Sequence, residues 1–380
     1  MPSFYEFFAG GGMVRAGLGK SWDCLFANDI DAKKANSYQA NWGSDAFRLG
    51  DVNALTAADL PGRADLVWGS FPCQDLSLAG AGAGLAGQRS GAFYPFWRLI
   101  KDLQAEGRAP KLVAIENVCG AITSRQGQDF QAICQTFAEA GYRFGALVIN
   151  ADFFLPQSRP RLFVIGVRED LAIDADLIAA GPTAHFHTPA LRPAIARLPD
   201  AIKDKAVWWA APAPATRSSR LLDLIEESPN SVGWHAPEQT RRLIDLMSPA
   251  NRAKLELAKS AGRRMVGCVY RRTRMDADGV RQQRAEIRFD DLAGCLRTPA
   301  GGSSRQTIMV VEGELVRSRL LSARETARLM GLPDSYQLPE GYNDAYHLTG
   351  DGVAVPVVRH LAKFLFEPVL AGKKAKRRAA

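Results

Sequence analysis

The sequence predicts an α/β fold in which a doubly wound, mostly parallel sheet is joined to a smaller basic domain. Apolar segments of strand length alternate with amphipathic segments of helical length over the first 167 residues, a pattern typical of such sheets. Glycine and polar residues follow several of these strands, at the edge where α/β proteins bind ligands. The alternation breaks near Leu171 and returns near Ser322, so the chain between these points is expected to form the second domain.

The first region supplies the strands and helices of the sheet. Strands are expected at residues 3–9, 22–29, 64–70, 111–117, 146–153 and 161–168. Helices are expected at residues 13–19, 31–41, 93–105 and 128–141. The last of these helices is amphipathic and ends at Gly141, a residue type that often follows the final turn of a helix.

The middle region is first irregular and then basic. Proline, alanine and charged residues dominate to about residue 220, which predicts a linker or an irregular segment. Helical segments are expected between Arg241 and Lys259. Strands at 265–275 and 280–289 flank the sequence Asp-Ala-Asp-Gly at 276–279, which is a hairpin signal. The two strands present six arginines, namely Arg271, Arg272, Arg274, Arg281, Arg284 and Arg288.

The net charge of +8 is concentrated in one stretch of the chain. Between Arg241 and Arg305 there are 15 Lys and Arg residues against 7 Asp and Glu residues, and the rest of the 380 residues is balanced. A basic stretch suits a polyanionic partner, because neutralising phosphates releases counterions. A solvated charged surface is the alternative that composition leaves open. Residues 371–380 are expected to form a basic, disordered tail.

Composition argues against several other classes of protein. No apolar run approaches the ~20 residues that span a bilayer, and the N-terminal segment lacks the pattern of a secretory signal. We therefore expect a cytoplasmic protein with no membrane association. The six cysteines are scattered without a C-x-x-C pair, which argues against a zinc site and indicates a reducing compartment.

The last part of the chain is expected to return to the first domain. Ser322 and Glu325 form a capping-box pattern that opens a helix, and the apolar helix expected from Val353 to Phe366 can pack on the sheet. The expected divisions are residues 1–169, 170–318, a return segment at 319–370 and the tail at 371–380.

A glycine turn and a strand-end acid predict a cofactor site. Gly10 and Gly12 follow the first strand, but Arg15 occupies the position where a dinucleotide fingerprint needs a third glycine. Asp29 ends the second strand, where an acid accepts hydrogen bonds from ribose hydroxyls. A nucleoside cofactor without a diphosphate fits this pattern, and S-adenosylmethionine is the common one. A plain turn glycine with a surface acid is the alternative.

Two further groups of polar residues follow apolar strands. Glu116 and Asn117 end the strand at 111–117, where a poorly solvated carboxyl group could donate a proton near neutral pH. Gln157, Arg159 and Arg161 alternate along an extended segment, so we expect their side chains to project together. A capping or salt-bridged glutamate and ordinary edge charges are the structural alternatives.

Taken together, these motifs resemble those of the DNA cytosine-5 methyltransferase family over nearly the whole chain. The motifs are FAGGG at 8–12, PCQ at 72–74, ENV at 116–118, QSRPR at 157–161, RETARLMGLP at 324–333 and GDGVAVP at 350–356. The resemblance implies a Rossmann-like S-adenosylmethionine-dependent methyltransferase fold. It also implies that residues 1–169 form the catalytic and cofactor-binding domain and that 170–318 form the target-recognition domain.

The resemblance assigns catalytic roles to four residues. Cys73 would add to carbon 6 of a flipped-out cytosine, which activates carbon 5 toward a sulfonium methyl group. Glu116 would protonate or hydrogen-bond ring nitrogen 3. Arg161 would hold the carbonyl oxygen of cytosine, and Arg159 would support the flipped nucleotide or its phosphate.

The resemblance also implies the cofactor contacts. Phe8, Ala9, Gly10 and Gly12 would lie beside the methionine part, and Asp29 would bind the ribose. The other implied cofactor residues are Ile30 against adenine, Asp51 and Val52 near its amino group, Pro72 near the methyl group, and Asp351 and Val353 in the closing motif. Asp351 stands where the family usually has asparagine.

Double-stranded DNA is the expected partner. The candidate DNA contacts are Gln74, Ser77, Arg89, Gln157, Arg271, Arg272, Arg274 and Arg305. Gln74, Ser77 and Arg89 belong to a glycine-rich stretch that could close over the substrate, and arginines of the basic region would read guanine edges or bind phosphates.

The setting expected for the enzyme is a bacterial restriction–modification or related defence system. It would act as a monomer associated with the nucleoid, with a cognate restriction endonuclease as a possible partner. The tRNA-methylating branch is the rival within the family, but its Cys-Phe-Thr motif is absent. A DNA-binding regulator with a vestigial domain is opposed by the intact motifs, and a nicotinamide-dependent oxidoreductase is opposed by Arg15.

Overall fold

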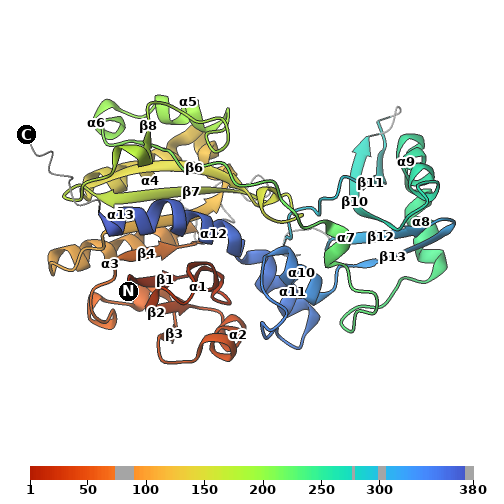
Figure 1. Cartoon of the computed structure of the whole chain (residues 1–380), viewed down its shortest axis with the longest axis horizontal. Coiled ribbons are helices and arrows are strands. Elements are labelled where there is room, and N and C mark those ends of the chain that lie inside the picture. Colours follow the sequence, from red (N-terminus) through yellow and green to blue (C-terminus); the bar gives the residue numbers. More distant parts are fainter. Residues whose placement is uncertain (73–89, 276–278, 298–304, 373–380) are drawn as a thin grey trace, which may run out of the picture. The chain divides into compact units, whose positions relative to one another are not determined.

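The computed structural model describes residues 1–72, 90–275, 279–297 and 305–372 and divides the chain into two compact units (Figure 1). Unit 1 comprises Met1–Asn150, Pro160–Pro214 and Val353–Ala380, and unit 2 comprises Ala151–Arg159 and Ala215–Gly352. The chain therefore passes between the units several times, and each unit contains segments that are distant in sequence.

Unit 1 is built on a sheet with the strand order β3-β2-β1-β4-β5-β7-β6. The strands are β1 Ser3–Phe7, β2 Asp23–Asp29, β3 Phe47–Leu49, β4 Leu66–Gly69, β5 Leu112–Val118, β6 Tyr142–Asn150 and β7 Pro160–Arg168. Neighbouring strands from β3 to β5 are parallel, and β7 runs antiparallel to both β5 and β6. The prediction of a mostly parallel α/β sheet is confirmed.

Helices cover both faces of this sheet. They are α1 Met13–Leu18, α2 Ala32–Trp42, α3 Phe93–Ala105, α4 Gln128–Glu139, α5 Leu191–Ala196, α6 Asp200–Lys203, α12 Val355–Leu361 and α13 Glu367–Ala371. On one face, apolar side chains of α3 and α4 pack with those of β1, β4 and β5 in a single core. On the other face, Trp68 of β4 contacts Phe366, which lies between α12 and α13. This arrangement on two faces is the doubly wound architecture that the alternation predicted.

The C-terminal helices pack directly against the first helix of the chain. A Cβ atom on Gly17 of α1 would lie 2.5 Å from the Cβ atom of Val358 in α12, so no larger residue fits without displacing a helix. The expectation that the helix from Val353 to Phe366 packs back on the first domain is confirmed, whereas residues 319–352 of the expected return segment belong to unit 2 by packing.

Two short strands and two helices between β7 and residue 214 also belong to unit 1 by packing. The strands, β8 Ile178–Ala179 and β9 Trp208–Trp209, pair with each other, and β9 packs on β6. The division by packing thus falls after Pro214, whereas the sequence placed a boundary after residue 169. Packing does not test which segment recognises the target, so the functional assignment of the domains stays a prediction.

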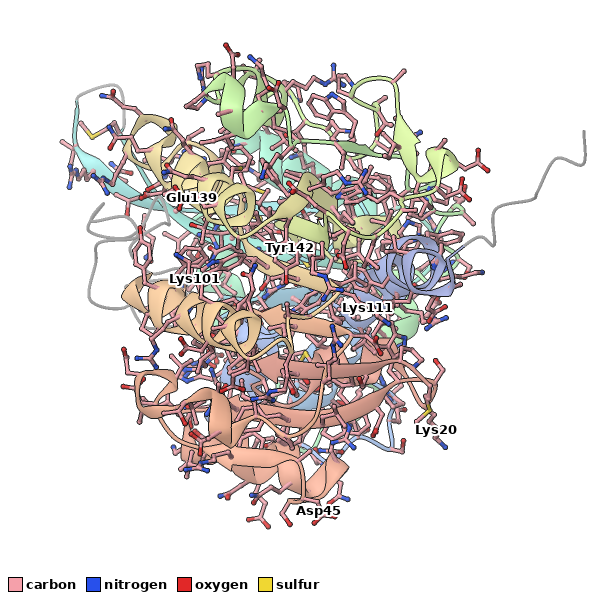
Figure 2. All side chains as sticks on the ribbon, turned by 90° about the vertical axis from the view of Figure 1, so that its left-hand side faces the viewer. Lys20, Asp45, Lys101, Lys111, Glu139 and Tyr142 are labelled. Atoms are coloured by element: carbon pink, nitrogen blue, oxygen red, sulfur yellow. The ribbon has the colours of Figure 1, made fainter. Side chains whose placement is uncertain are left out.

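Figure 2 looks onto unit 1 at the end of the sheet where the parallel strands begin. Lys111 directly precedes β5 and Tyr142 is the first residue of β6. Lys111 pairs with Asp65 at 2.9 Å, and the Tyr142 hydroxyl donates to the carbonyl of Pro110 at 2.8 Å. These contacts fix the start of the strands, and the candidate site lies at their other end.

Unit 2 is built on an antiparallel sheet with the order β11-β10-β12-β13. Its strands are β10 Met265–Met275, β11 Arg281–Arg288, β12 Thr307–Glu312 and β13 Leu315–Leu320. Its helices are α7 Leu221–Leu224, α8 Pro237–Asp245, α9 Pro249–Lys259, α10 Ala323–Leu329 and α11 Tyr342–Asp351. Leu255 and Ala258 of α9 pack on Val269, Ala285 and Ile287. The predicted hairpin is confirmed as β10–β11, and residues 276–278 of its turn lie outside the described residues.

A buried ion pair and a helix cap stabilise the start of α10. Ser322 accepts a hydrogen bond from the backbone N–H of Glu325, and the Glu325 carboxylate accepts from the backbone N–H of Ser322 at 2.7 Å. The predicted capping box is therefore confirmed. The same carboxylate accepts two hydrogen bonds from Arg319, at 2.6 and 2.7 Å, with both side chains fully buried.

Within the described part of the chain, no helix combines the length and the apolar character needed to cross a membrane.

Candidate active site at the carboxyl edge of the sheet

The ends of neighbouring parallel strands bring the predicted site residues to one edge of unit 1. Asp29 is the last residue of β2, Phe71 and Pro72 closely follow β4, and Glu116 and Asn117 lie near the end of β5. Because β2, β4 and β5 belong to the parallel run β2-β1-β4-β5, their carboxyl ends share an edge. The sequence prediction that polar residues gather there is confirmed for these positions.

Glu116 and Arg161 form an ion pair at this edge. β7 runs antiparallel to β5, and its pairing of Arg161 with Val118 places the start of β7 beside the end of β5. The Arg161 Nε atom lies 3.2 Å from the Glu116 Oε1 atom, and the two side chains are 15% and 8% exposed. The pair is thus mostly desolvated but still reaches solvent. A guanidinium donor beside a carboxylate acceptor is suited to bind a small polar ring that has both donors and acceptors.

Asn117 fixes the segment that leads to Cys73. Its Nδ2 atom donates to the carbonyl of Phe71 at 3.2 Å, and its Oδ1 atom accepts from the backbone N–H of Val118 at 2.8 Å. The structure therefore ties the chain two residues before Cys73 to the strand that carries Glu116. Cys73, Gln74, Ser77 and Arg89 themselves lie outside the described residues.

The glycine turn and Asp29 form a second part of the edge. The Gly10 backbone N–H donates to Asp29 Oδ2 at 2.8 Å. Gly10 and Gly12 have φ values of 55° and 76°, which glycine adopts readily. A Cβ atom on Gly12 would lie 2.4 Å from the indole nitrogen of Trp42, whereas one on Gly10 would meet no heavy atom within 4 Å. Space therefore remains open beside Gly10, where the backbone can approach a ligand.

The residues around this turn fit a nucleoside. Ile30, directly after Asp29, is 68% exposed, and an apolar side chain left in water beside a strand-end acid is suited to cover a flat base. Asp51 accepts from the backbone N–H of Asn53 at 2.9 Å, and Val52 is buried. Leu49, at the end of β3, is 51% exposed. Leu49 was not among the residues predicted for the cofactor site, and its place at the end of a short strand was the signal in the sequence.

A buried carboxyl group below the glycine turn was also given no role from the sequence. Glu6 of β1 is 1% exposed, and its burial raises the pKa of the carboxyl group to about 8, against the opposing charge of Arg15. Arg15 donates to the hydroxyl of Tyr38 at 3.1 Å. In the sequence, the presence of Glu6 within an otherwise apolar strand was the feature that could have indicated this buried acid.

Gln157 and Arg159 have partners of their own within unit 2. Gln157 is fully buried and donates to the carbonyl of Leu329 at 2.6 Å. Arg159 is 2% exposed and donates at 2.7 Å to the carbonyls of both Gly350 and Gly352.

The side chains of Gln157, Arg159 and Arg161 thus have different partners, and their expected common face stays a prediction. Gln157 and Arg159 donate to backbone carbonyls inside unit 2, while Arg161, the second residue of β7, pairs with Glu116 in unit 1. The predicted contacts of Gln157 and Arg159 with the nucleotide stay predictions.

The remaining predicted residues are distributed over both units. Asp351 ends α11 in unit 2 between the two glycines held by Arg159, and Val353 is buried in unit 1. Phe8 has a φ of 58°, and Ala9 is buried and donates its N–H to the Asn28 carbonyl at 2.9 Å.

The predicted DNA-contact arginines of unit 2 differ in exposure. Arg271, Arg272 and Arg274 are exposed on β10. Arg305 lies over the Tyr342 ring, at 5.7 Å from its centroid, and donates to Asn343. No cluster of three His, Cys, Asp or Glu side chains suited to a metal ion occurs among the described residues.

Comparison with known proteins gives one consistent family. The family model for C-5 cytosine-specific DNA methylase matches residues 3–367. The chain is 26% identical to Type II methyltransferase M.NlaX of Neisseria lactamica, over 96% of each chain. It is also 26% identical to Type II methyltransferase M.NgoBI of Neisseria gonorrhoeae, over 97% of this chain and 95% of the relative.

Solved structures support the fold. The S. pombe Dnmt2 methyltransferase superposes with a TM-score of 0.61 at 16% identity, covering 97% of this chain and 99% of that chain. The Entamoeba histolytica methyltransferase EhMeth gives a TM-score of 0.61 at 14% identity, covering 97% and 98%. At these identities the likeness concerns the fold alone.

Proposed function

The chain belongs to the C-5 cytosine-specific DNA methylases, and from this membership we propose how its residues carry out methylation of cytosine in duplex DNA. The protein is a DNA cytosine-5 methyltransferase, and its family uses S-adenosylmethionine. The observation that carries the proposal is the Glu116–Arg161 pair at 3.2 Å. Glu116 lies next to Asn117 on β5, and the Asn117 side chain holds the segment before Cys73.

The cofactor is proposed to lie against the carboxyl edge of unit 1. When bound, S-adenosylmethionine supplies an electrophilic methyl group. Asp29 would accept hydrogen bonds from ribose hydroxyls, and Ile30 would cover the base. The open space beside Gly10 supports this placement, because the backbone there is free to approach the methionine part. Phe8, Ala9, Gly12, Asp51, Val52, Pro72, Asp351 and Val353 are proposed to complete the site.

Cys73 is proposed as the nucleophile. Its thiolate adds to carbon 6 of cytosine, so a sulfur–carbon bond forms and the ring electrons move to carbon 5. Glu116 donates a proton or a hydrogen bond to nitrogen 3, and Arg161 donates to the carbonyl oxygen. Both interactions stabilise the negative charge that the addition places on the ring.

The second half of the reaction restores the aromatic ring. Carbon 5 uses its electron pair to bond to the methyl group while the methyl–sulfonium bond breaks, and the electrons of the broken bond stay on the sulfur of the demethylated cofactor, which leaves. A base or a water molecule then removes the proton from carbon 5. The electrons of that bond re-form the double bond between carbons 5 and 6. The sulfur–carbon bond between Cys73 and carbon 6 breaks and returns the Cys73 thiolate, and a proton donated to nitrogen 3 returns to Glu116.

The target base must leave the duplex for this chemistry, at a cost of a few kcal/mol. Gln74, Ser77 and Arg89 are proposed to contact the DNA around it, together with Gln157, Arg271, Arg272, Arg274 and Arg305. Arg159 is proposed to support the flipped nucleotide by positioning, since its guanidinium holds the carbonyls of Gly350 and Gly352.

The biological setting is proposed from the relatives. Several of them are named Type II methyltransferases, which supports a role in restriction–modification with a cognate endonuclease. A monomer that works on DNA in the bacterial cytoplasm and associates with the nucleoid is the simplest form of this proposal.

Transfer of a labelled methyl group from S-adenosylmethionine to duplex DNA tests the proposal directly. We expect incorporation by the wild-type chain and none by Cys73→Ala. A duplex that carries 5-fluorocytosine at the target should form a covalent complex, because fluorine blocks removal of the carbon-5 substituent. Full activity of Cys73→Ala would show that the covalent route is wrong.

A further inference from the structure

One face of the β10–β11 hairpin in unit 2 is lined by alternating charged residues. In the pairing of the two strands, Arg272 lies opposite Arg284 and Tyr270 lies opposite Glu286. Directly opposed residues share a face, and so do alternate residues along a strand. Arg274 therefore belongs to the same face. We call these five residues the arginine face.

Glu286 orients two guanidinium groups on the arginine face. Its Oε1 atom accepts from Arg274 Nε at 2.9 Å and from a second nitrogen of Arg274 at 2.5 Å, and its Oε2 atom lies 3.2 Å from Arg272 Nε. The Arg272 guanidinium also lies over the Tyr270 ring, at 5.8 Å from its centroid. Both arginine side chains are 53% exposed and Glu286 is 29% exposed, so the oriented groups remain accessible.

The arginine face keeps an excess of positive charge that packing does not require. It has three arginines and one carboxylate, and Arg272 and Arg284 are directly opposed like charges, which destabilise a strand pair. On the other face of the hairpin, Val269, Ala285 and Ile287 are covered by α9 and its neighbours. Arg271 and Arg281 lie on that other face beyond the covered residues and are exposed. The arginine face differs from it in that a carboxylate orients its guanidinium groups toward an electronegative partner.

The position of Glu286 between two arginines favours contact of the arginine face with bases over contact with phosphates. A carboxylate between two arginines would repel the phosphate backbone and weaken binding there. In the major groove it has a favourable role, because it accepts a hydrogen bond from the amino group of cytosine while arginine binds O6 and N7 of guanine. A two-stranded ribbon also has the right width to enter that groove.

We propose that Glu286, with Arg272 and Arg274, reads a G·C base pair in the major groove of the DNA substrate. This inference rests on the proposed function and deepens it: these arginines contact bases, and Glu286 becomes a residue that determines sequence specificity. Arg271 lies on the opposite face of the hairpin and is not part of this reader.

The test compares Glu286→Gln with the matched variant Glu314→Gln. Glu314 is 86% exposed and pairs with Lys259 at 3.2 Å, away from the hairpin. Each purified protein is given duplex DNA with randomised sequence, and bisulfite sequencing reads every methylated site. We expect Glu286→Gln to lose roughly tenfold or more of the discrimination at one G·C position, while Glu314→Gln keeps the wild-type preference.

Salt dependence of DNA binding supplies a second readout. If Arg272 contacts a base, Arg272→Gln should relax the sequence preference at one position and leave the salt slope unchanged. If it contacts a phosphate, the slope should fall by about one unit with the preference intact.

Unchanged discrimination in Glu286→Gln, with higher affinity for all sequences, would overturn the inference while leaving the proposed function in place. Absence of methylation by the wild-type chain would instead remove the proposed function, and the inference with it.

Discussion

Each unit contains an arginine–glutamate pair, and the two pairs differ in how completely the protein encloses them. In unit 2, both Arg319 and Glu325 are fully buried, and the guanidinium also donates to the backbone carbonyls of Glu226 and Leu320. In unit 1, Arg161 and Glu116 retain 15% and 8% exposure. The first pair is enclosed on every side by its own fold, whereas the second meets solvent at a strand end.

This difference in exposure suggests that the Arg319–Glu325 pair stabilises the fold, whereas the Arg161–Glu116 pair is suited to bind a ligand. Burying charges is costly unless each is paired and hydrogen-bonded, and Arg319 and Glu325 meet that condition. A pair that keeps some exposure at the carboxyl edge of a sheet can exchange water for substrate without unfolding its surroundings. Variants in each pair should therefore separate activity from stability.

The largest effect is expected from Arg161→Ala, measured as turnover of labelled methyl groups. Loss of a donor that stabilises developing charge should lower kcat by roughly 10²–10³-fold, with little change in the melting temperature. Arg168→Ala is the matched control, because Arg168 lies at the opposite end of the same strand and pairs with Asp170 at 2.6 Å. Equal loss of activity in both variants would mean that β7 is disrupted and that Arg161 has no special role.

The reverse behaviour is expected for Arg319→Met, measured by chemical denaturation. The change leaves Glu325 as a buried charge without its partner, which should lower the free energy of unfolding by about 3–5 kcal/mol. Arg317→Met is the control, since the Arg317 and Arg319 guanidiniums lie 4.3 and 4.9 Å from the Trp234 ring centroid but Arg317 pairs with the partly exposed Glu312. The comparison fails if the two variants lose the same stability.

Glu6 is a further buried acid, and its protonation is altered by its surroundings. Burial raises the pKa of the Glu6 carboxyl group to about 8, because it outweighs the nearby charge of Arg15. The unfolded chain releases this proton near its ordinary pKa, so folding is favoured at low pH. Stability should fall between about pH 4.5 and pH 8, by an amount on the order of a few kcal/mol.

Glu6→Gln should remove this contribution. Denaturation curves measured at intervals between pH 5 and pH 8 should show a smaller loss of stability with rising pH in the variant than in the wild type. A loss of the same size in both proteins would mean that Glu6 does not bind the proton in the folded state.

The smallest effect is expected from Asp29→Asn, measured as the KM for S-adenosylmethionine. Asparagine keeps an oxygen for the Gly10 N–H but is a weaker acceptor for ribose hydroxyls, so the KM should rise by roughly tenfold, equivalent to about 1.4 kcal/mol. Asp31→Asn is the control, because Asp31 caps α2 through the N–H of Lys33 at 2.8 Å. A rise in KM only in the Asp31 variant would place the ribose elsewhere.

The strands and helices of the sheet could be predicted because each depends on the hydrophobic pattern of its own short segment. The apolar run at 64–70 and the helix at 93–105 need only hydrophobic periodicity, and both form, as β4 Leu66–Gly69 and α3 Phe93–Ala105. The strand-end positions of Asp29 and Glu116 follow from the same patterns once the strands are parallel. The capping box at Ser322 was recognisable because its two residues are three apart.

Contacts between distant segments could not be predicted in this way. The alternation of Gln157, Arg159 and Arg161 suggested a common face, but the partners of Arg159 are carbonyls near residue 350. Backbone carbonyls carry no sequence signal. The same holds for Glu286, which looked like one charge in a basic stretch until strand pairing placed it opposite Tyr270 and beside two arginines.

The contact between Gly17 and Val358 has a consequence for how the chain is made. A ribosome delivers the glycine turn and α1 long before α12, and the two helices that meet there are separated by all of unit 2 in the sequence. The apolar face of α1 therefore stays uncovered until α12 and α13 have left the ribosome. A protein that ends prematurely after unit 2 should therefore expose that face and depend on chaperones, even though every predicted catalytic residue has already been synthesised.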